Sequence, residues 1–157
     1  MAYRINGLDP LQFAPLVQAS DADLASHAAM RVVADSDPGF PCRVSLEDAA
    51  VGETLLLLQH VSHDVATPFR SSYAIYVRAR ALIAACYEDS IPLALDRRTV
   101  ALRAFGSNAM LYMADLAVPG ELDGKIRTLF EDPQVAYIHA HYAAPGCFAA
   151  TIQKYGT

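Results

Sequence analysis

Short apolar runs separated by turn residues recur along the chain, and their lengths are those of β-strands. The run of four leucines in segment 53–61 predicts a strand that is buried on both faces. Segment 73–78 is its expected return partner, and the loop 62–71 between them is long enough to carry function. A hairpin is expected from 99–105 and 109–118, because the glycine and asparagine between them tolerate positive φ. Further strands are expected at 3–5 (an edge strand), 30–34, 135–142 and 147–152.

Helical patterns are short. Segment 122–130 carries its apolar residues on one face of an amphipathic helix, and segment 9–28 offers two capping sites for short helices. Segment 45–48 predicts one helical turn, and segment 81–87 predicts another short helix. Hairpins outnumber βαβ crossovers, so the sequence predicts an α+β fold: a mainly antiparallel sheet of about six strands built from hairpins, with short flanking helices.

Composition narrows the class of protein. The 157 residues form one ordinary domain, and their 54% hydrophobic content with 18% charged residues indicates a large core or a dimer. A net charge of -5 argues against a nucleic-acid partner, which requires a basic surface. Three widely spaced cysteines, no signal peptide and no apolar run of membrane-spanning length favour a soluble, cytoplasmic protein with reduced thiols and no membrane association.

The densest group of chemically capable side chains lies in segment 137–148. Side chains alternate along a strand, so Tyr137, His139 and His141 share one face. Two histidines spaced in this way commonly hold one metal ion, which predicts a divalent transition metal at His139 and His141. A catalytic alternative uses Cys147 as nucleophile and His141 as its base. A third alternative is that both histidines are structural or face solvent.

Whether Cys147 joins the histidine face depends on the loop before it. An odd number of loop residues would place Cys147 beside His141, and an even number would place it with Tyr142 on the opposite face. The sequence of this loop, Ala143-Ala144-Pro145-Gly146, allows either closure.

Other side chains could converge on a pocket beside this hairpin. Cys42 and Arg43 follow a turn stiffened by two prolines, a setting that suits pre-organised ligand binding. Arg70, at the end of the loop 62–71, could bind an anion, and Tyr137 could line the same pocket. The plainer interpretations are a structural turn at 35–43 and a surface ion pair at Arg70.

Three stretches of the chain, 37–43, 132–141 and 146–150, resemble a bacterial family of small uncharacterised proteins, number twelve hundred and three in the series of domains of unknown function. The resemblance covers nearly the whole chain and implies a bacterial, stand-alone, single-domain protein. It brings no activity, substrate, cofactor or site residue with it, so the chemistry depends on the residues themselves.

Two functions from different classes remain. The first is a small-molecule- or metal-binding pocket on the C-terminal hairpin, built from His139, His141 and Cys147, with a small anionic ligand held by arginine. The second is a non-enzymatic, homo-oligomeric binding or assembly module, such as a homodimer, favoured by the high apolar content. The sequence leaves open the reaction if there is one, the substrate, the metal, the oligomeric state and the order of the strands.

Overall fold

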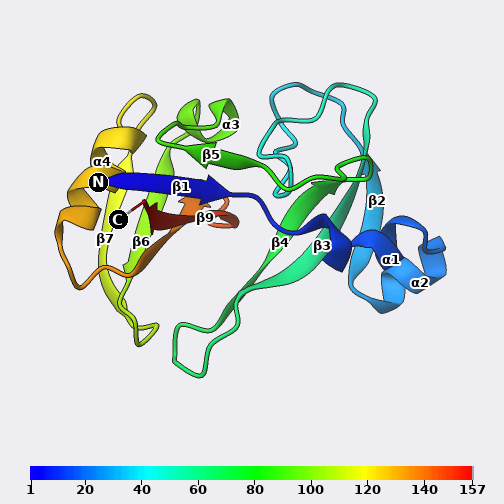
Figure 1. The fold of residues 1–157 in the computed structure, drawn as a ribbon. Helices are drawn as coiled ribbons and strands as arrows, with labels where there is room; N and C mark the ends of the chain where they lie inside the picture. Colours follow the sequence, from blue (N-terminus) through cyan, green and yellow to red (C-terminus); the bar gives the residue numbers. More distant parts are fainter. Residues whose placement is uncertain (157) are drawn as a thin grey trace.

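The computed structural model describes residues 1–156, which form two antiparallel sheets (Figure 1). The larger sheet has six strands in the order β5-β1-β9-β8-β6-β7. Its strands are β1 (Ala2–Asn6), β5 (Cys86–Glu88), β6 (Val100–Phe105), β7 (Leu111–Ala117), β8 (Tyr137–Tyr142) and β9 (Phe148–Tyr155). The predicted α+β class with a mainly antiparallel sheet is therefore confirmed.

Helix α4 (Leu122–Glu131) covers one face of this sheet (Figure 1). Its apolar residues Ile126, Leu129 and Phe130 are buried in one cluster with Ile138 and Ala140 of β8. Only one face of β8 can point at the helix, so the face that carries His139 and His141 is turned toward the smaller sheet.

The smaller sheet has the order β2-β3-β4, built from β2 (Ala29–Val33), β3 (Thr54–His63) and β4 (Ser71–Arg78). Its core is covered by short helices near the N-terminus, with Phe13 and Leu24 packing beside Leu56 and Leu58. The short helices are η1 (Pro10–Gln12), α1 (Ala14–Val17), α2 (Asp21–Ser26) and, beside the larger sheet, α3 (Leu93–Asp96).

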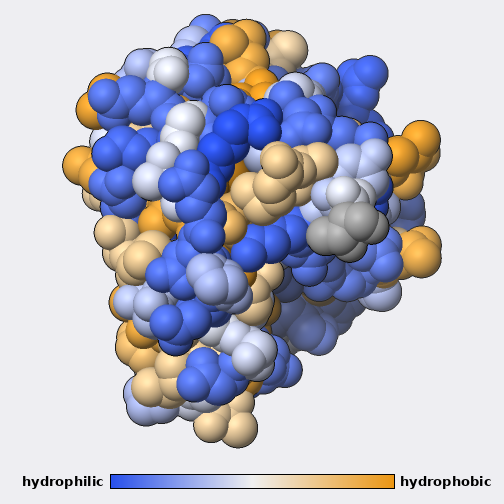
Figure 2. All heavy atoms as spheres, turned by 60° about the vertical axis from the view of Figure 1, so that its left-hand side comes forward, coloured by the Kyte–Doolittle hydropathy of each residue, from blue (hydrophilic) through white to orange (hydrophobic). Residues whose placement is uncertain are grey.

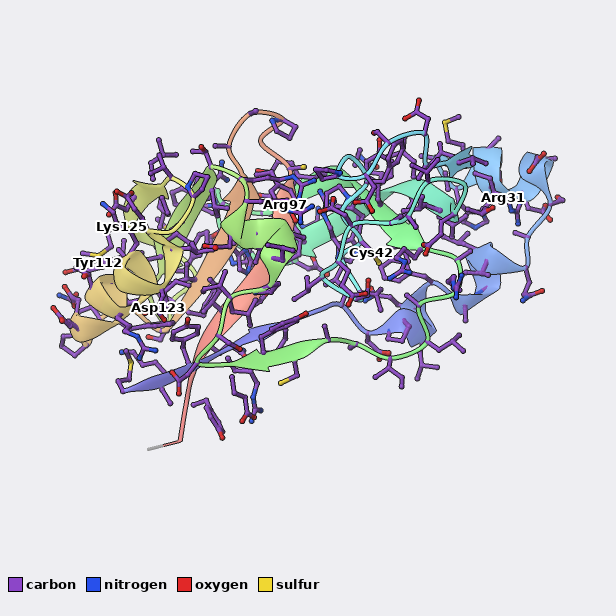
Figure 3. All side chains as sticks on the ribbon, turned by 90° about the horizontal axis from the view of Figure 1, so that it is seen from above. Arg31, Cys42, Arg97, Tyr112, Asp123 and Lys125 are labelled. Carbon is purple, nitrogen blue, oxygen red and sulfur yellow. The ribbon has the colours of Figure 1, made fainter. Side chains whose placement is uncertain are left out.

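Two connections hold the sheets together. The loop between β2 and β3 is joined to β4 by the backbone N–H of Arg43, which donates to the Tyr76 carbonyl at 3.0 Å, and to β9 of the larger sheet by the Arg43 side chain, whose Nε donates to the Phe148 carbonyl at 2.7 Å. The β3–β4 loop reaches the tip of the β6–β7 hairpin, where the Thr67 hydroxyl donates to the Ala109 carbonyl at 3.2 Å. Seen from above, Cys42 lies near the middle of the molecule (Figure 3), where it is buried in the core of the smaller sheet with Leu56 and Ile75. Both connections therefore bring the smaller sheet against the histidine side of β8.

Ion pairs lie at the two ends of the molecule. Around α4, Lys125 pairs with Asp115 at 2.9 Å, whereas at the opposite end Arg31 pairs with Asp21 at 2.9 Å (Figure 3). These pairs are partly exposed and contribute little to stability. In the part of the chain that is described, every helix falls short of the length and apolar character that a membrane crossing requires.

Three local predictions are wrong. Segment 3–5 is not an edge strand, because β1 lies between β5 and β9. Segment 81–87 is not a helix: Leu82 and Ile83 are exposed, and the chain enters β5 instead. The backbone N–H of Ala85 donates to the Val44 carbonyl, and the Ala85 carbonyl accepts from the N–H of Gly7. Segment 45–48 forms no helical turn, since Leu46 adopts a left-handed φ of 54°.

Candidate functional site

A cavity of about 690 Å³ opens where the β2–β3 loop, β4 and the β8–β9 hairpin meet. Tyr73 and Tyr76 of β4 form one wall, and the hairpin turn 143–146 forms another. Arg43 and Cys147 line it from the loop and from the hairpin. The volume is in the range of small-molecule sites.

The closure of the β8–β9 hairpin decides where Cys147 lies. The N–H of Tyr142 donates to the Cys147 carbonyl at 3.0 Å, and the N–H of Gly146 donates back to Tyr142 at 2.8 Å. The four residues 143–146 therefore form the loop, and Gly146 supplies the positive φ of 79° that the turn requires. This is the even-numbered alternative, so Cys147 lies with Tyr142 and not on the histidine face.

Arg43 is the most unusual side chain of the pocket, because it is only 2% exposed yet bonds to no carboxylate among the described residues. Its Nε donates to the Phe148 carbonyl at 2.7 Å, and its Nη1 donates to the Pro41 carbonyl at 2.5 Å. Its Nη2 donates to the Sγ of Cys147 at 2.9 Å. A guanidinium has five N–H donors, so two remain free.

Tyr142 adds a second polar group. Its ring is 4% exposed, and the guanidinium of Arg43 stacks over it at 5.0 Å from the ring centre. Burial raises the pKa of Tyr142 to about 12, so its hydroxyl keeps its proton at neutral pH. Within residues 1–156 this hydroxyl makes no hydrogen bond, which leaves a donor available at the pocket wall.

The guanidinium of Arg98 lies on the same ring but is already neutralised. Its centre is 5.3 Å from the centre of the Tyr142 ring, and it donates to both carboxylate oxygens of Asp48 at 2.6 and 3.0 Å. Of the two arginines that line the cavity, Arg43 alone therefore has an uncompensated charge.

The histidine face predicted for β8 is confirmed, but it lies behind the cavity rather than in its wall. His139 and His141 are 5% and 2% exposed, and their ring centres are 6.5 Å apart. A bulge in β9 pairs His141 with Phe148, whose ring packs against both imidazoles. The ring of Tyr73 separates His141 from the cavity, with ring centres 5.0 Å apart.

Both imidazoles are held neutral. Burial lowers the pKa of His139 to about 3, with neighbouring histidines and Arg103 adding to the effect. Burial also lowers the pKa of His141 to about 4, although its hydrogen bond to Gly146 opposes the shift. The Nδ1 of His141 donates to the Gly146 carbonyl at 3.0 Å, so its Nε2 carries a free lone pair.

Tyr137 is bound to a histidine that the sequence did not single out as buried. The Nδ1 of His63 donates to the Phe69 carbonyl at 2.9 Å, so its Nε2 accepts the Tyr137 hydroxyl at 2.7 Å. His63 was expected in a loop because the strand pattern weakens after residue 61, but β3 continues through it.

Arg103 was missed altogether. It pairs with His139 across β6 and β8, and its Nη1 donates to the Tyr73 hydroxyl at 3.1 Å. It forms no ion pair within the described residues. The alternation of 99–105 was the available signal, since it places Arg103 on the face of a strand that later proves to adjoin β8.

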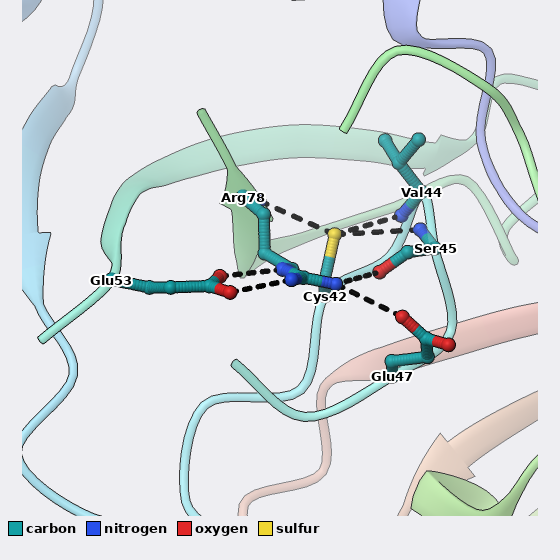
Figure 4. A network of polar contacts seen from close by, with 6 residues as sticks. All are labelled: Cys42, Val44, Ser45, Glu47, Glu53 and Arg78. Carbon is teal, nitrogen blue, oxygen red and sulfur yellow. Dashed lines mark hydrogen bonds and ion pairs between the residues drawn. The ribbon is translucent and has the colours of Figure 1, made fainter. Parts of the chain in front are cut away.

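The remaining candidates lie outside the cavity wall. Cys42 is buried, and its Sγ accepts backbone N–H groups of Val44, Ser45 and Arg78 at 3.2–3.4 Å (Figure 4). These contacts fasten the loop to β4. Arg70 is 58% exposed and pairs with Asp64 at 3.1 Å, as the plainer interpretation expected.

No three His, Cys, Asp or Glu side chains within residues 1–156 converge in an arrangement that could hold a metal ion. His139 and His141 supply at most two such ligands, and Cys147 is turned to the other side of the hairpin. A bound metal would require further ligands from outside this group, so metal binding stays a prediction of the sequence.

Comparison with known families gives a match to a family model. A family model described as "Protein of unknown function (DUF1203)" matches residues 39–154, well over half of the chain. No curated protein and no solved structure matches. The matched range includes the β2–β3 loop and the β8–β9 hairpin, which carry the stretches that suggested this family from the sequence. The chain belongs to the DUF1203 family.

Proposed function

We propose that the protein binds a small anionic molecule in the cavity between β4 and the β8–β9 hairpin. The observation that carries the proposal is Arg43, a buried arginine without a carboxylate partner in the described residues. Burying an unpaired charge is costly, and an anion bound beside the guanidinium would repay that cost. The two free N–H groups of Arg43 and the Tyr142 hydroxyl are hydrogen-bond donors, which suit an anion.

The surroundings add positive potential. Arg103 lies behind Tyr73 without an ion-pair partner among the described residues, and the electrostatic influence of Arg43 and Arg103 reaches His141. This interior is basic in a chain whose net charge is -5. A basic interior inside an acidic protein concentrates small anions better than it attracts polyanions such as nucleic acids.

Thermal unfolding with a panel of anions tests the proposal. Acetate, benzoate, inorganic phosphate and phenylphosphonate are added separately, and at least one of them should raise the unfolding temperature in a concentration-dependent manner. A stabilising anion should also slow the alkylation of Cys147 by iodoacetamide, because Cys147 lines the cavity. The exposed Cys86 serves as the internal control, and its alkylation should not change.

Substitutions test whether the stabilisation and the protection of Cys147 both arise from an anion bound at Arg43. Arg43→Gln should abolish both responses, whereas Arg70→Gln, with the same charge change at an exposed ion pair, should retain them. Since Arg43→Gln could fail to fold, Ala144→Trp provides a second route: Ala144 is exposed and lines the cavity, so the new ring should block it without touching Arg43. The proposal is wrong if no anion protects Cys147, or if protection survives in both pocket variants.

Catalysis is not part of the proposal. A cysteine nucleophile needs its base within hydrogen-bonding distance. The Sγ of Cys147 contacts Arg43 instead, and the Nδ1 of His141 is bonded to Gly146. Cys147 and His141 as a catalytic pair therefore remain a sequence prediction. We expect a cytoplasmic protein, in keeping with three cysteines that are all unpaired.

A homodimer is the second candidate, supported by the edge strand β7. Leu111, Tyr112, Leu116 and, just beyond the strand, Val118 are 36–52% exposed. Apolar residues on this side of the molecule form several separate patches rather than one broad surface (Figure 2). Such patches favour a weak association over an obligate one. Sedimentation velocity at micromolar concentrations distinguishes the cases: a strict monomer would exclude the homodimer, and a dimer that Leu116→Lys dissociates would support it.

A further inference from the structure

The charge balance of the cavity limits the kind of anion that it would accept. Arg98 is neutralised by Asp48, whose side chain is 5% exposed and accepts two N–H groups from Arg98. Arg43 is the one lining residue with a charge that no described carboxylate compensates. One net positive charge at the wall matches one negative charge on the ligand, because a second buried negative charge would itself be unpaired.

The remaining walls are apolar and aromatic. Tyr73, Tyr76 and Tyr142 line the cavity, together with apolar residues that include Leu57 and the proline of the hairpin turn, Pro145. The hydroxyl of Tyr73 already accepts from Arg103, which holds that ring in place. Aromatic walls favour a flat ring on the ligand through stacked or edge-to-face contacts.

The size of the cavity excludes the smallest anions as a good fit. About 690 Å³ is much larger than one phosphate or acetate ion requires, and such an ion would leave the apolar walls in contact with water. A ligand with a ring would cover these walls and gain about 25 cal/mol for each Å² of apolar surface removed from water.

We propose that the cavity accepts a monocarboxylic acid with a flat, largely apolar ring, its carboxylate bound by Arg43 and the Tyr142 hydroxyl and its ring lying between Tyr73, Tyr76 and the hairpin turn. This inference rests on the proposed function and specifies its ligand class. Dianions such as phosphate monoesters and polar anions such as sugar acids belong to the classes that the site disfavours.

Isothermal titration calorimetry with simple probes tests the ligand class. Benzoate is compared with benzamide, which has the same shape without the charge, with acetate, which lacks the ring, and with phenylphosphonate, which carries a second charge near neutral pH. Benzoate should bind most tightly, and each of the others should bind at least about tenfold more weakly, a difference of about 1.4 kcal/mol. Benzamide loses the charge and acetate loses the ring contacts, whereas phenylphosphonate brings a second negative charge that would be unpaired in the cavity.

A hydroxyl deletion gives a finer test. Tyr142→Phe keeps the ring and its stacking with Arg43 but removes the donor, so benzoate affinity should fall about tenfold. The weaker binding of benzamide should fall by less, because a hydrogen bond to a neutral carbonyl is weaker than one to a carboxylate. Tyr112→Phe, on the exposed surface beside α4, is the matched control and should leave benzoate binding unchanged.

The outcomes separate the two proposals. Failure of all four probes both to bind and to protect Cys147 would overturn the proposed function and this inference together. Protection of Cys147 by phenylphosphonate or acetate at affinities equal to or above that of benzoate would retain the anion site and overturn the ligand class. Equal affinities for benzoate and benzamide would show that the charge of Arg43 is not used, and would also overturn it.

Discussion

The two buried imidazoles of β8 should make the protein lose stability in mild acid. The unfolded chain binds a proton at each histidine with the ordinary pKa of 6.5, whereas in the folded state the pKa is about 3 for His139 and about 4 for His141. The folded pKa values are lowered, so protonation favours the unfolded state. Stability is complete above about pH 6.5 and declines as the pH falls toward 4.

The size of the effect follows from the proton balance. At pH 5 the unfolded chain holds nearly one proton at each of the two positions and the folded chain holds almost none, so each histidine lowers the free energy of unfolding by about 2 kcal/mol. The two together remove about 4 kcal/mol, a large part of the 5–15 kcal/mol that typically stabilises a domain. With an m-value of about 2 kcal/mol/M, the urea midpoint should fall by about 2 M between pH 8 and pH 5.

The range from pH 8 to pH 5 separates the loss of stability caused by histidines from the loss caused by carboxylates. Ion pairs with arginine lower the pKa values of Glu53 and Asp123, and the stability that these two carboxylates contribute is lost only below their ordinary range, near pH 4. Burial also lowers the pKa of His60, which acts in the same direction as the two β8 histidines. Urea unfolding curves recorded at half-unit steps from pH 8 to pH 5 therefore report on buried imidazoles.

Substitutions identify the histidines that cause the pH dependence of the free energy of unfolding. His139→Gln and His141→Gln should each remove about 2 kcal/mol of the loss of stability between pH 8 and pH 5, whatever their absolute stability. His27→Gln, which removes an exposed histidine after α2, is the control. If either variant does not fold, the imidazole proton resonances of the wild-type protein provide the same information, because two of them should still be in the neutral form at pH 5. A free energy of unfolding that stays constant from pH 8 to pH 5 would refute the reasoning.

Two matched pairs of substitutions test the packing and the ion pairs by urea unfolding. Gly7→Ala should cost more than about 2 kcal/mol, because a Cβ there would lie 2.0 Å from the Val44 carbonyl oxygen, whereas Gly124→Ala, with open space around it in α4, should stabilise by about 0.5–1 kcal/mol. Equal effects at the two glycines would contradict the backbone clash. Glu53→Gln should cost about 3 kcal/mol, because it breaks a partly buried, two-point contact with Arg78, and Glu47→Gln, at the exposed side of the same arginine, should cost less than about 1 kcal/mol. Figure 4 shows both carboxylates in contact with the Arg78 guanidinium. The reverse order of the two effects would show that exposure does not govern these pairs.

Local sequence patterns predicted those features of the fold that are set by residues close together in the sequence. The alternation in segment 135–142 identified the face that carries His139 and His141, because one side of β8 had to pack against α4. The class of the fold followed from the hairpins. These features depend on contacts between neighbours in sequence, and local patterning describes such contacts well.

Long-range pairing explains what the sequence could not provide. Segment 81–87 has the composition of a helix, but backbone hydrogen bonds to Val44 and Gly7 and the pairing of β5 with β1 draw it into an extended form. The position of Arg103 opposite His139 depends on the order of the strands, which places β6 beside β8, and local sequence patterns do not reveal this order. The side of Cys147 was fixed by two backbone hydrogen bonds in a loop whose sequence allows either closure.

The interior between the two sheets differs in polarity from the core beside α4. The face of the six-stranded sheet that meets α4 is filled mainly by aliphatic side chains, with a few aromatic rings. By contrast, Arg43, Arg103 and two neutral histidines occupy or adjoin the space behind Tyr73, with no carboxylate bonded to them in residues 1–156. A buried cation such as Arg43 reduces stability unless an anion joins it, and the two histidines make the fold sensitive to acid. Under the proposed function, an anion bound beside Arg43 offsets the cost of burying this charge.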